Sequence, residues 1–228
     1  MSENETKSII LLSGGLDSVV SLALVREDLN VTLALTFDYG QKSAAKEIEA
    51  SAKIACHYGL EHKVIKLDWL KEITHTALCS DKDVPTGDAL KNEEESAKSV
   101  WVPNRNGLFL NIAGAFADAE GFTNIIIGAN KEEAQTFPDN TKEFIERVNA
   151  EFEYSTRVHP QITAPLIDCD KIEIVRLALK HNAPLELLNS CYANTQKHCG
   201  KCESCVRLKR ALEANNDTVY IKKLFEEQ

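Results

Sequence analysis

Short apolar runs alternate along the chain with longer segments in which apolar residues recur every three or four positions. This alternation is typical of β-α-β units that build a mostly parallel sheet. We therefore expect an α/β fold with a Rossmann-like, doubly wound sheet. The expected strands cover residues 9–12, 31–37, 63–67, 124–128 and 161–164. The expected helices run through residues 19–25, 44–55, 108–119, 141–148 and 172–179.

The length of the chain, 228 residues, is enough for one well-buried α/β domain with a small appendage. We expect the α/β domain to span residues 1–189 and a small helical region, which holds a cysteine cluster, to span residues 190–228. Residues 80–99 form the most polar stretch, so we expect a mobile surface insertion there.

The charge balance limits the classes of partner. The formal net charge is -9, and Lys and Arg never form a run of five, which argues against nucleic acid as a partner. Residues 1–7 are polar, and no apolar stretch approaches the roughly 18 residues that a membrane span requires. We expect a cytoplasmic protein that binds neither nucleic acid nor a membrane.

Residues 13–18 carry the sequence SGGLDS and stand between the first expected strand and the first expected helix. Adjacent Gly14 and Gly15 let the backbone approach an anion, and the free N–H groups of a new helix supply donors. The segment lacks the lysine of a GxxxxGK[ST] loop and the spacing of a GxGxxG dinucleotide motif. It predicts a phosphate site of another kind, or else an ordinary βα turn with a Ser or Asp N-cap.

Further site candidates follow from the strand ends, because ligands of doubly wound sheets bind beyond the carboxyl ends of the strands. The loops that this rule brings to one edge are residues 13–18, 38–41, 128–140 and the segment after residue 165. Lys171, near the start of the helix that follows, is a candidate phosphate ligand. Cys169 is close enough to be a candidate nucleophile, although a packed or surface thiol is the alternative.

Four of the seven cysteines lie close together with the spacing C-x7-C-x2-C-x2-C. They are Cys191, Cys199, Cys202 and Cys205. In a reducing compartment this spacing favours a closed, structural zinc site. An iron–sulfur cluster is the main alternative, although the C-x3-C-P completion of a ferredoxin run is missing. His198 adjoins the cluster, and we expect its side chain to be solvated rather than a ligand.

The SGGxDS pattern of residues 13–18 resembles the loop of the N-type ATP pyrophosphatases, the group that includes NAD synthetase and GMP synthetase. The resemblance implies that ATP is cleaved between its α and β phosphates, which yields an adenylated substrate and pyrophosphate. It also implies that Asp17 places Mg²⁺ against the pyrophosphate. The ATP-binding residues implied are Leu12, Ser13, Gly14, Gly15, Leu16, Asp17, Ser18, Asp38, Tyr39, Gln41 and Gly128.

A second set of motifs narrows the resemblance. The motifs are FDYGQ at residues 37–41, VPNRN at residues 102–106, Pro138 with Asp139, and CY followed by CGxC-x2-C at residues 191–205. Over residues 8–212 they resemble the family of 7-cyano-7-deazaguanine synthases. The resemblance implies adenylation of 7-carboxy-7-deazaguanine by ATP and attack by ammonia to give an amide. A second adenylation then leaves a nitrile.

The same resemblance implies roles for individual residues. The catalytic residues implied are Asp17, Ser18, Arg105 and Lys171, the last two for the pyrophosphate charge. The substrate-binding residues implied are Arg105, Asn106, Phe137 and Asp139. Asp139 is alternatively an N-cap of the helix expected at residues 141–148. The GYPDC run common in the family is TFPDN here, in residues 136–140.

Two other functions stay open at this point. One is another adenylating amidase or ligase that acts on a different carboxylate, and the other is an ATP-binding zinc scaffold without turnover. The resemblance also implies a homodimer, for which Trp101 or Phe109 are candidate contacts unless they belong to the core. No glutaminase segment is recognisable, so we expect ammonia to come from solution or from a separate donor.

Overall fold

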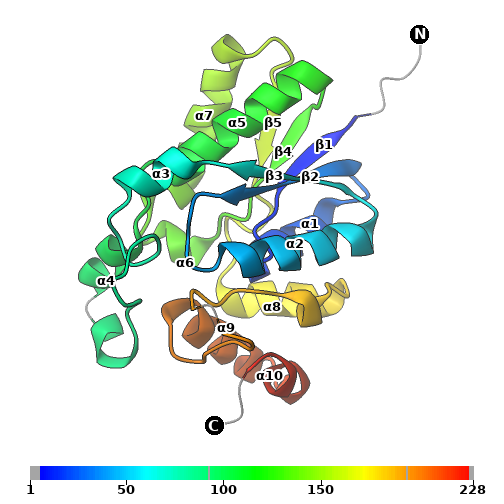
Figure 1. Cartoon of the computed structure of the whole chain (residues 1–228). Coiled ribbons are helices and arrows are strands. Elements are labelled where there is room, and N and C mark those ends of the chain that lie inside the picture. Colours follow the sequence, from blue (N-terminus) through cyan, green and yellow to red (C-terminus); the bar gives the residue numbers. More distant parts are fainter. Residues whose placement is uncertain (1–5, 92, 194, 226–228) are drawn as a thin grey trace.

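The computed structural model describes residues 6–91, 93–193 and 195–225. In these residues, parallel strands form one sheet in the order β3-β2-β1-β4-β5 (Figure 1). The strands are β1 (Ser8–Leu11), β2 (Val31–Asp38), β3 (Glu61–Lys66), β4 (Asn124–Ile126) and β5 (Gln161–Thr163). The parallel α/β sheet expected from the sequence is confirmed.

Helices cover both faces of the sheet, as in other doubly wound folds. One face carries α1 (Leu16–Val25), α2 (Ala44–Tyr58) and α8 (Lys171–Lys180), and the other carries α5 (Arg105–Glu120) and α7 (Lys142–Ser155) (Figure 1). The shorter elements are α3 (Asp68–Ile73), α4 (Glu93–Val100), α6 (Lys131–Ala134), and the 3-10 helices η1 (Gly87–Lys91), η2 (Pro138–Asn140) and η3 (Leu185–Leu187). Within the described ranges, no helix is both long and apolar enough to traverse a bilayer.

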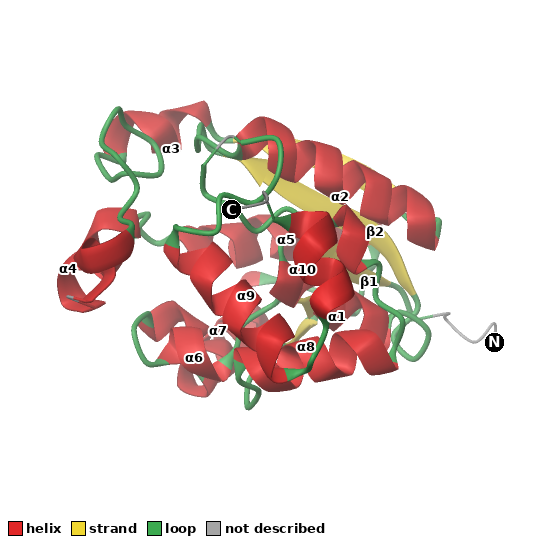
Figure 2. Cartoon of the chain, turned by 90° about the horizontal axis from the view of Figure 1, so that it is seen from below, coloured by secondary structure: helices red, strands yellow, loops and turns green. Residues whose placement is uncertain are grey.

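The last two helices, α9 (Glu203–Ala214) and α10 (Thr218–Leu224), lie beyond α8. Figure 2 views the molecule from that side and shows α9 and α10 in front of α1 and α8. Leu208 and Leu212 of α9 share a buried cluster with Ile174 of α8. The C-terminal helices therefore pack directly on the α/β part of the chain, and the domain boundary expected at residues 189 and 190 stays a prediction.

The side chains of β1 and of the residue after it show why both faces of the sheet are covered. Ile10 and Leu12 belong to the buried cluster that includes α1 and α8. Ile9 and Leu11 belong to the cluster that includes α5 and α7. Successive side chains of a strand point to opposite faces, so a run of consecutive apolar residues indicates a strand buried on both sides.

The central position of β1 also determines where a ligand can bind. β2 and β3 lie on one side of β1, whereas β4 and β5 lie on the other. The chain leaves β1 and β4 in opposite directions, and a crevice opens between the loops at their carboxyl ends. Residues 13–18, which we call the anion loop, follow β1 at this point.

The expected elements are present, with some ends shifted. β3 begins at Glu61 instead of residue 63, and β4 ends at Ile126 instead of residue 128. β3 is a partly exposed edge strand, so polar residues at its start gave no apolar signal. The helix expected at residues 141–148 continues as α7 to Ser155. The described part of residues 80–99 contains η1 and most of α4, and its mobility stays a prediction.

Candidate active site

A pocket of about 240 Å³ lies at the carboxyl ends of the strands. It brings most of the predicted site residues together. They are Leu12, Ser13, Gly15, Leu16, Asp17, Ser18, Tyr39, Gln41, Arg105, Asn106, Gly128, Phe137, Asp139 and Lys171. Of the residues expected to bind ATP or substrate, Gly14 and Asp38 do not line this pocket. Asp38 instead accepts a hydrogen bond from the Gly40 amide (3.1 Å) and supports the turn after β2.

The anion loop is held in shape by its own serines. Gly15 donates its amide to Ser13 Oγ (3.2 Å), and Ser18 Oγ donates to the Gly15 carbonyl (3.1 Å). The N-cap of α1 is Gly15, so the alternative of a turn with a Ser or Asp N-cap is wrong. The residues in the first turn of α1 line the pocket, which places the N-terminal end of that helix beside the ligand position.

Gly14 explains how the anion loop approaches α2. Its φ is +77°, and a Cβ on this residue would lie 2.8 Å from Ala50 Cβ. Any other residue would strain the backbone and push α2 away from the loop. Gly14 is thus required for packing behind the loop, whereas Gly15 lines the pocket itself.

Three charged side chains meet beside the anion loop. Lys171 Nζ donates to Asp17 Oδ2 (2.6 Å) and to Glu133 Oε1 (2.8 Å). Lys171 is only 6% exposed, so its ammonium depends on these two carboxylates for stabilisation. Among the described residues, the buried Asp17 Oδ1 has no hydrogen-bond partner. An oxygen in this state is suited to bind a cation.

Burial and mutual attraction set the protonation of this group. Burial disfavours the Lys171 ammonium, but the two carboxylates outweigh burial and raise the pKa of Lys171. Burial raises the pKa of Asp17, against the attraction of Lys171. For Glu133, attraction to Lys171 and more distant cations outweighs burial and lowers the pKa to about 2. Lys171 is therefore a permanent cation in the pocket at neutral pH.

Gly128 follows β4 and lies against the backbone of the anion loop. A Cβ on Gly128 would lie 2.8 Å from Ser18 N and 2.9 Å from the carbonyl carbon of Asp17. These neighbours are backbone atoms, so they cannot turn aside as a flexible side chain can. The lack of a side chain at Gly128 therefore determines how closely the end of β4 approaches Asp17.

Arg105 supplies a second positive charge to the pocket. Arg105 is the first residue of α5 and follows the N-cap Asn104, which has a φ of +51°. Burial opposes the guanidinium charge, but the contact with Tyr39, which includes a hydrogen bond, and attraction to Asp139 raise the pKa of Arg105. Burial also raises the pKa of Tyr39 to about 12, so this phenol is neutral. Asn106 Nδ2 donates to the Asp139 carbonyl (3.1 Å) and ties the start of α5 to η2.

Two aromatic pairs line the same pocket. The rings of Phe37 and Phe109 stack with their centroids 3.9 Å apart, and those of Trp101 and Phe137 with their centroids 5.9 Å apart. Phe109 and Trp101, named above as candidate dimer contacts, are therefore part of the pocket wall. The pairs give the pocket flat apolar surfaces, which suit a planar ring.

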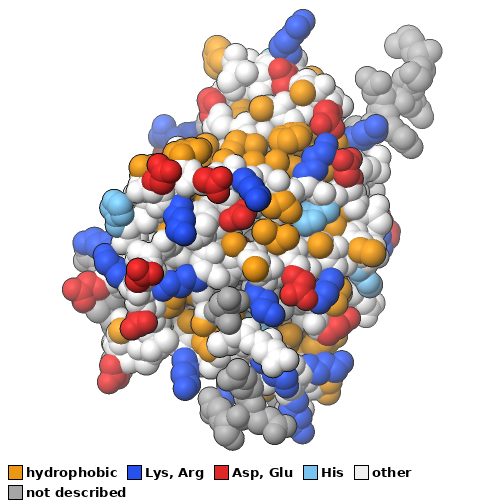
Figure 3. Space-filling view, in the orientation of Figure 1, with side chains coloured by type: hydrophobic (Ala, Val, Ile, Leu, Met, Phe, Trp, Pro, Cys, Tyr) orange, Lys and Arg blue, Asp and Glu red, His pale blue; other side chains and the backbone are white. Residues whose placement is uncertain are grey.

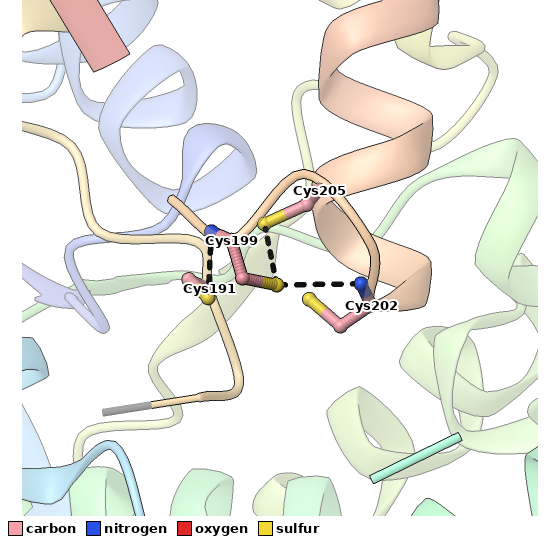
Figure 4. Close-up of side chains that lie close together, drawn as sticks. All are labelled: Cys191, Cys199, Cys202 and Cys205. Carbon is pink, nitrogen blue, oxygen red and sulfur yellow. Dashed lines mark hydrogen bonds between the residues drawn. The ribbon is translucent and has the colours of Figure 1, made fainter. Parts of the chain in front are cut away.

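The four cysteines converge as their spacing predicted (Figure 4). All four Sγ atoms lie within 4.8 Å of one another. The Cys199 amide donates to Cys191 Sγ (3.5 Å), and the amides of Lys201 and Cys202 donate to Cys199 Sγ (3.4 Å each). The thiols of Cys202 and Cys205 form hydrogen bonds with Cys191 and lower its pKa. The same hydrogen bonds raise the pKa of Cys202 and Cys205, so within the cluster the negative charge is favoured on Cys191.

This arrangement fits a single tetrahedral metal ion. Zn–S bonds of about 2.3 Å place the sulfurs of a tetrahedral site about 3.8 Å apart. Cys199 Sγ lies 3.9 Å from Cys205 Sγ, close to that value. Four cysteines complete the coordination of zinc, so such a site has no open position for a substrate.

The expectation that the His198 side chain is solvated was wrong. His198 is 4% exposed. Its Nε2 accepts the Ser190 amide (3.0 Å), and its Nδ1 lies 3.2 Å from the Leu224 carbonyl. The ring of Phe225 also contacts it. His198 is therefore buried between the cysteine cluster and α10, and its two ring nitrogens contact the Ser190 amide and the Leu224 carbonyl.

The family model described as "Queuosine biosynthesis protein QueC" matches residues 7–216. The chain belongs to the QueC family. A relative named "7-cyano-7-deazaguanine synthase" from Methanosarcina mazei is 50% identical over 91% of this chain and 94% of its own. A relative of the same name from Carboxydothermus hydrogenoformans is 50% identical over 92% of this chain and 99% of its own. Another from Bdellovibrio bacteriovorus is 47% identical over 100% of both chains.

Among solved structures, this QueC family member is similar to the NH3-dependent NAD synthetase from Campylobacter jejuni. The TM-score is 0.47 at 18% identity, and the match covers 97% of this chain and 80% of that one.

Two alternatives for this QueC family member can now be decided. Asp139 does not cap α7, because the N-cap is Thr141, whose Oγ1 accepts the Phe144 amide (3.2 Å). Asp139 lines the pocket, and its role in base recognition stays a prediction. Cys169 does not line this pocket, and burial and nearby carboxylates raise the pKa of its thiol. The surroundings of Cys169 therefore do not activate it as a nucleophile.

The pocket also contains polar residues that the sequence analysis did not single out. They include Glu47, Glu133, Ser190, Glu203 and Arg207. Glu133 falls within residues 128–140, which the strand-end rule had marked, so this carboxylate was within reach of prediction. Ser190 and Arg207 reach the pocket only through packing of the C-terminal part of this QueC family member, and no local pattern signals that contact.

Proposed function

We propose that the chain converts 7-carboxy-7-deazaguanine and ammonia into 7-cyano-7-deazaguanine in an ATP-dependent ligase reaction of queuosine or archaeosine synthesis. The observation that carries this proposal is the identity of 47–50% with 7-cyano-7-deazaguanine synthases across 91–100% of the chain. The pocket supports it, because an anion loop, two cations and flat aromatic surfaces lie together there.

The proposed chemistry makes a carboxylate reactive. Direct attack by ammonia would have to expel oxide, which is a poor leaving group. A carboxylate oxygen therefore first attacks the α-phosphorus of ATP, and pyrophosphate leaves. Ammonia then attacks the carbonyl carbon of the adenylate, and AMP leaves to give an amide. The amide oxygen then attacks the α-phosphorus of a second ATP, and a second pyrophosphate leaves. Loss of AMP and two protons from this adenylated amide yields the nitrile.

The anion loop and Lys171 are the groups that we assign to the pyrophosphate. Ser13, Gly15 and the first turn of α1 offer hydroxyl and N–H donors to an anion, and the N-terminal end of the helix adds a partial positive charge. Lys171 remains charged at neutral pH because of its carboxylate partners. These fixed groups stabilise the charge that develops on the leaving pyrophosphate. Arg105 adds a second cation to the same pocket.

Asp17 is the residue that we assign to Mg²⁺. Its Oδ1 is buried and, within the part of the chain that the structure describes, has no hydrogen-bond partner. Mg²⁺ prefers carboxylate oxygens of this kind. When bound there, the ion supplies positive charge against the pyrophosphate.

The base end of the substrate is assigned to the part of the pocket near Arg105, Asn106, Phe137 and Asp139. The Asp139 carboxylate can accept from the N1–H and 2-amino groups of a guanine-like ring, and Asn140 Nδ2 donates to it (3.1 Å) and orients it. Phe137 offers an aromatic face for the ring. Asn106 supports this part of the pocket through its bond to the Asp139 backbone.

The four-cysteine cluster is assigned to one structural Zn²⁺. Sulfurs that lie within 4.8 Å of one another fit one ion better than a cage of several iron atoms. This observation favours zinc over the iron–sulfur alternative. Zinc would connect the segment at Cys191 to the start of α9, where Cys202 is the N-cap.

The remaining expectations concern the setting of the reaction. On the face seen in Figure 3, acidic and basic side chains are interspersed instead of forming a patch of one sign. The expectation that nucleic acid is not a partner stays a prediction from the formal net charge of -9. Free ammonia as the nitrogen source, a homodimer and a cytoplasmic location stay predictions that follow from the family resemblance and the composition.

The proposed function is tested by incubation of the purified chain with MgATP, ammonium and 7-carboxy-7-deazaguanine. We expect the nitrile product by mass spectrometry, with two AMP and two pyrophosphate for each nitrile. The corresponding amide should also be converted, with one AMP for each nitrile. Turnover of a different carboxylate alone would favour another ligase of the same superfamily. Binding of ATP without any turnover would favour a zinc scaffold.

Gly128→Ala is expected to lower the rate of nitrile formation about tenfold or more, because a small displacement of reacting groups has large effects on rate. The added methyl group would overlap the backbone at Asp17 and Ser18 and shift the first turn of α1. Steady-state kinetics and thermal melting are the measurements. Gly59→Ala is the matched control: Gly59 has a positive φ at the end of α2, with nothing within 4 Å of an added Cβ. Gly59→Ala should lose stability but keep the rate of nitrile formation. A normal rate in Gly128→Ala would contradict the inference that Gly128 determines how closely β4 approaches Asp17.

A further inference from the structure

The segment that leads into the cysteine cluster lies against the anion loop. Asn189 donates its amide to the Gly14 carbonyl (2.9 Å). Leu16, in the first turn of α1, donates its amide to Ser190 Oγ (3.1 Å). The same oxygen lies 3.8 Å from the point that a Cβ on Gly15 would occupy. Two residues from a distant part of the chain therefore lie directly over the loop.

The Ser190 hydroxyl has a proton that it can donate to a ligand. A hydroxyl offers one donor and two acceptor sites, and the Leu16 amide uses an acceptor site. Within the described residues, the Ser190 proton has no acceptor. Ser190 is half-buried and lines the pocket, so the proton is accessible from the ligand position.

The backbone of Ser190 is fixed from the other side by the C-terminal region. Its amide donates to His198 Nε2 (3.0 Å), and His198 Nδ1 lies 3.2 Å from the Leu224 carbonyl. A carbonyl only accepts, so Nδ1 is the protonated nitrogen of this ring and Nε2 is the acceptor. Cys191, the next residue, belongs to the cysteine cluster. These contacts hold the hydroxyl over a loop that lies 174 residues earlier in the sequence.

We propose that Ser190 is a phosphate-binding residue of the ATP site. An anion that enters the loop takes the Leu16 N–H as a donor, as anions at helix N-termini do. The released Ser190 hydroxyl then donates its proton to a phosphate oxygen of the pyrophosphate group, in a charge-assisted hydrogen bond. The inference rests on the proposed function, because it requires that the loop binds the pyrophosphate part of ATP.

A purely structural role for Ser190 predicts an effect of the opposite sign. If Ser190 only satisfied the Leu16 amide while the loop is empty, it would compete with the incoming anion. Removal of the hydroxyl would then leave the affinity for phosphate unchanged or increase it. A direct bond to phosphate predicts a loss of affinity instead, so the sign of the change separates the two roles.

The experiment is titration calorimetry with the full chain, after metal analysis of each sample, with MgATP and with pyrophosphate as ligands. We expect Ser190→Ala to raise both dissociation constants about tenfold, the effect of one hydrogen bond to a charged group. The KM for ATP should rise more than kcat falls. The wild type and Ser190→Ala should bind adenosine, which has no phosphate, with equal affinity. Thr156→Ala is a control, because that hydroxyl donates to the Phe152 carbonyl (2.7 Å) away from the pocket.

A matched pair of variants, Ser190→Thr and Ser190→Val, has side chains of equal shape that differ only in the hydroxyl. If Ser190→Ala folds poorly or loses its metal, this pair decides whether the hydroxyl binds phosphate. The Ser190→Thr variant should bind pyrophosphate about tenfold more tightly than the Ser190→Val variant. Equal affinities in the pair, or unchanged or tighter binding by Ser190→Ala, would overturn the proposal. If the wild type forms the nitrile while Ser190→Ala binds MgATP normally, only this inference fails. A wild type that binds neither MgATP nor pyrophosphate contradicts the proposed function as well.

Discussion

Asp17→Asn is expected to lower the rate of nitrile formation by about 10²–10³-fold and to change the melting temperature little. A rate loss of this size is usual when one electrostatic contact to a developing charge is removed. The proposed role of Asp17 depends on its negative charge beside the anion loop. Its Oδ1 is buried and has no partner among the residues described. Asparagine keeps the shape of the side chain but binds a divalent cation more weakly, so the packing should be retained and the rate should fall. Steady-state kinetics at saturating ATP and thermal melting are the measurements.

Stability should be retained in Asp17→Asn because of the second carboxylate. Lys171 Nζ contacts both Asp17 Oδ2 (2.6 Å) and Glu133 Oε1 (2.8 Å). After the substitution, Lys171 still has Glu133 as an ionic partner. The two carboxylates and one ammonium of the wild type are then replaced by one carboxylate and one ammonium, whose charges balance. The buried ammonium is therefore not left without compensation.

Lys171→Met is the contrasting variant. It leaves two carboxylates close together without their cation, and breaking a buried ion pair in this way costs about 3–5 kcal/mol of stability. This variant should therefore lose both activity and melting temperature, whereas Asp17→Asn should lose activity alone. A rate near that of the wild type in Asp17→Asn would contradict the assignment of Asp17. A large drop in its melting temperature would contradict the argument from Glu133.

The sheet and the anion loop could be predicted because both depend on patterns within a few residues. Consecutive apolar residues at positions 9–12 indicate a strand buried on both faces, and the adjacent glycines mark the turn that follows. The rule for strand ends then brought Gly128 and Lys171 to the same edge as the loop. Of the ATP-binding residues expected from the sequence, Gly14 and Asp38 do not line the pocket but support the loop and the turn after β2, and the others line it.

Contacts between distant segments could not be predicted from the sequence. The ion pair of Glu133 with Lys171 depends on how α6 packs against α8. His198 was expected to be solvated because it stands next to a cysteine ligand, but Leu224 and Phe225 near the C-terminus bury it. The bond from Leu16 to Ser190 likewise joins opposite ends of the chain. Each contact follows from the packing of helices or loops that are distant in the sequence, and no short motif indicates it.

Cys202→Ala is expected to abolish stoichiometric zinc binding and to lower the melting temperature by about 10 °C or more, since structural zinc contributes on the order of 10 kcal/mol to local folding. Cys202 is 1% exposed and is the N-cap of α9. Its loss therefore removes a metal ligand at the point where the helix begins. Unfolding should start in α9 and α10, and hydrogen exchange should show faster opening there than in β1.

Cys56→Ala is the matched control for this prediction, because Cys56 is exposed and lies outside the cluster. It should retain one zinc per chain by metal analysis and the melting temperature of the wild type. Full zinc content in Cys202→Ala, or iron in the wild type, would contradict the zinc assignment. If zinc is lost without any fall in melting temperature, the metal does not stabilise the C-terminal helices. Because Asn189 and Ser190 connect the cluster to the anion loop, the loss of zinc should also weaken MgATP binding before the sheet unfolds.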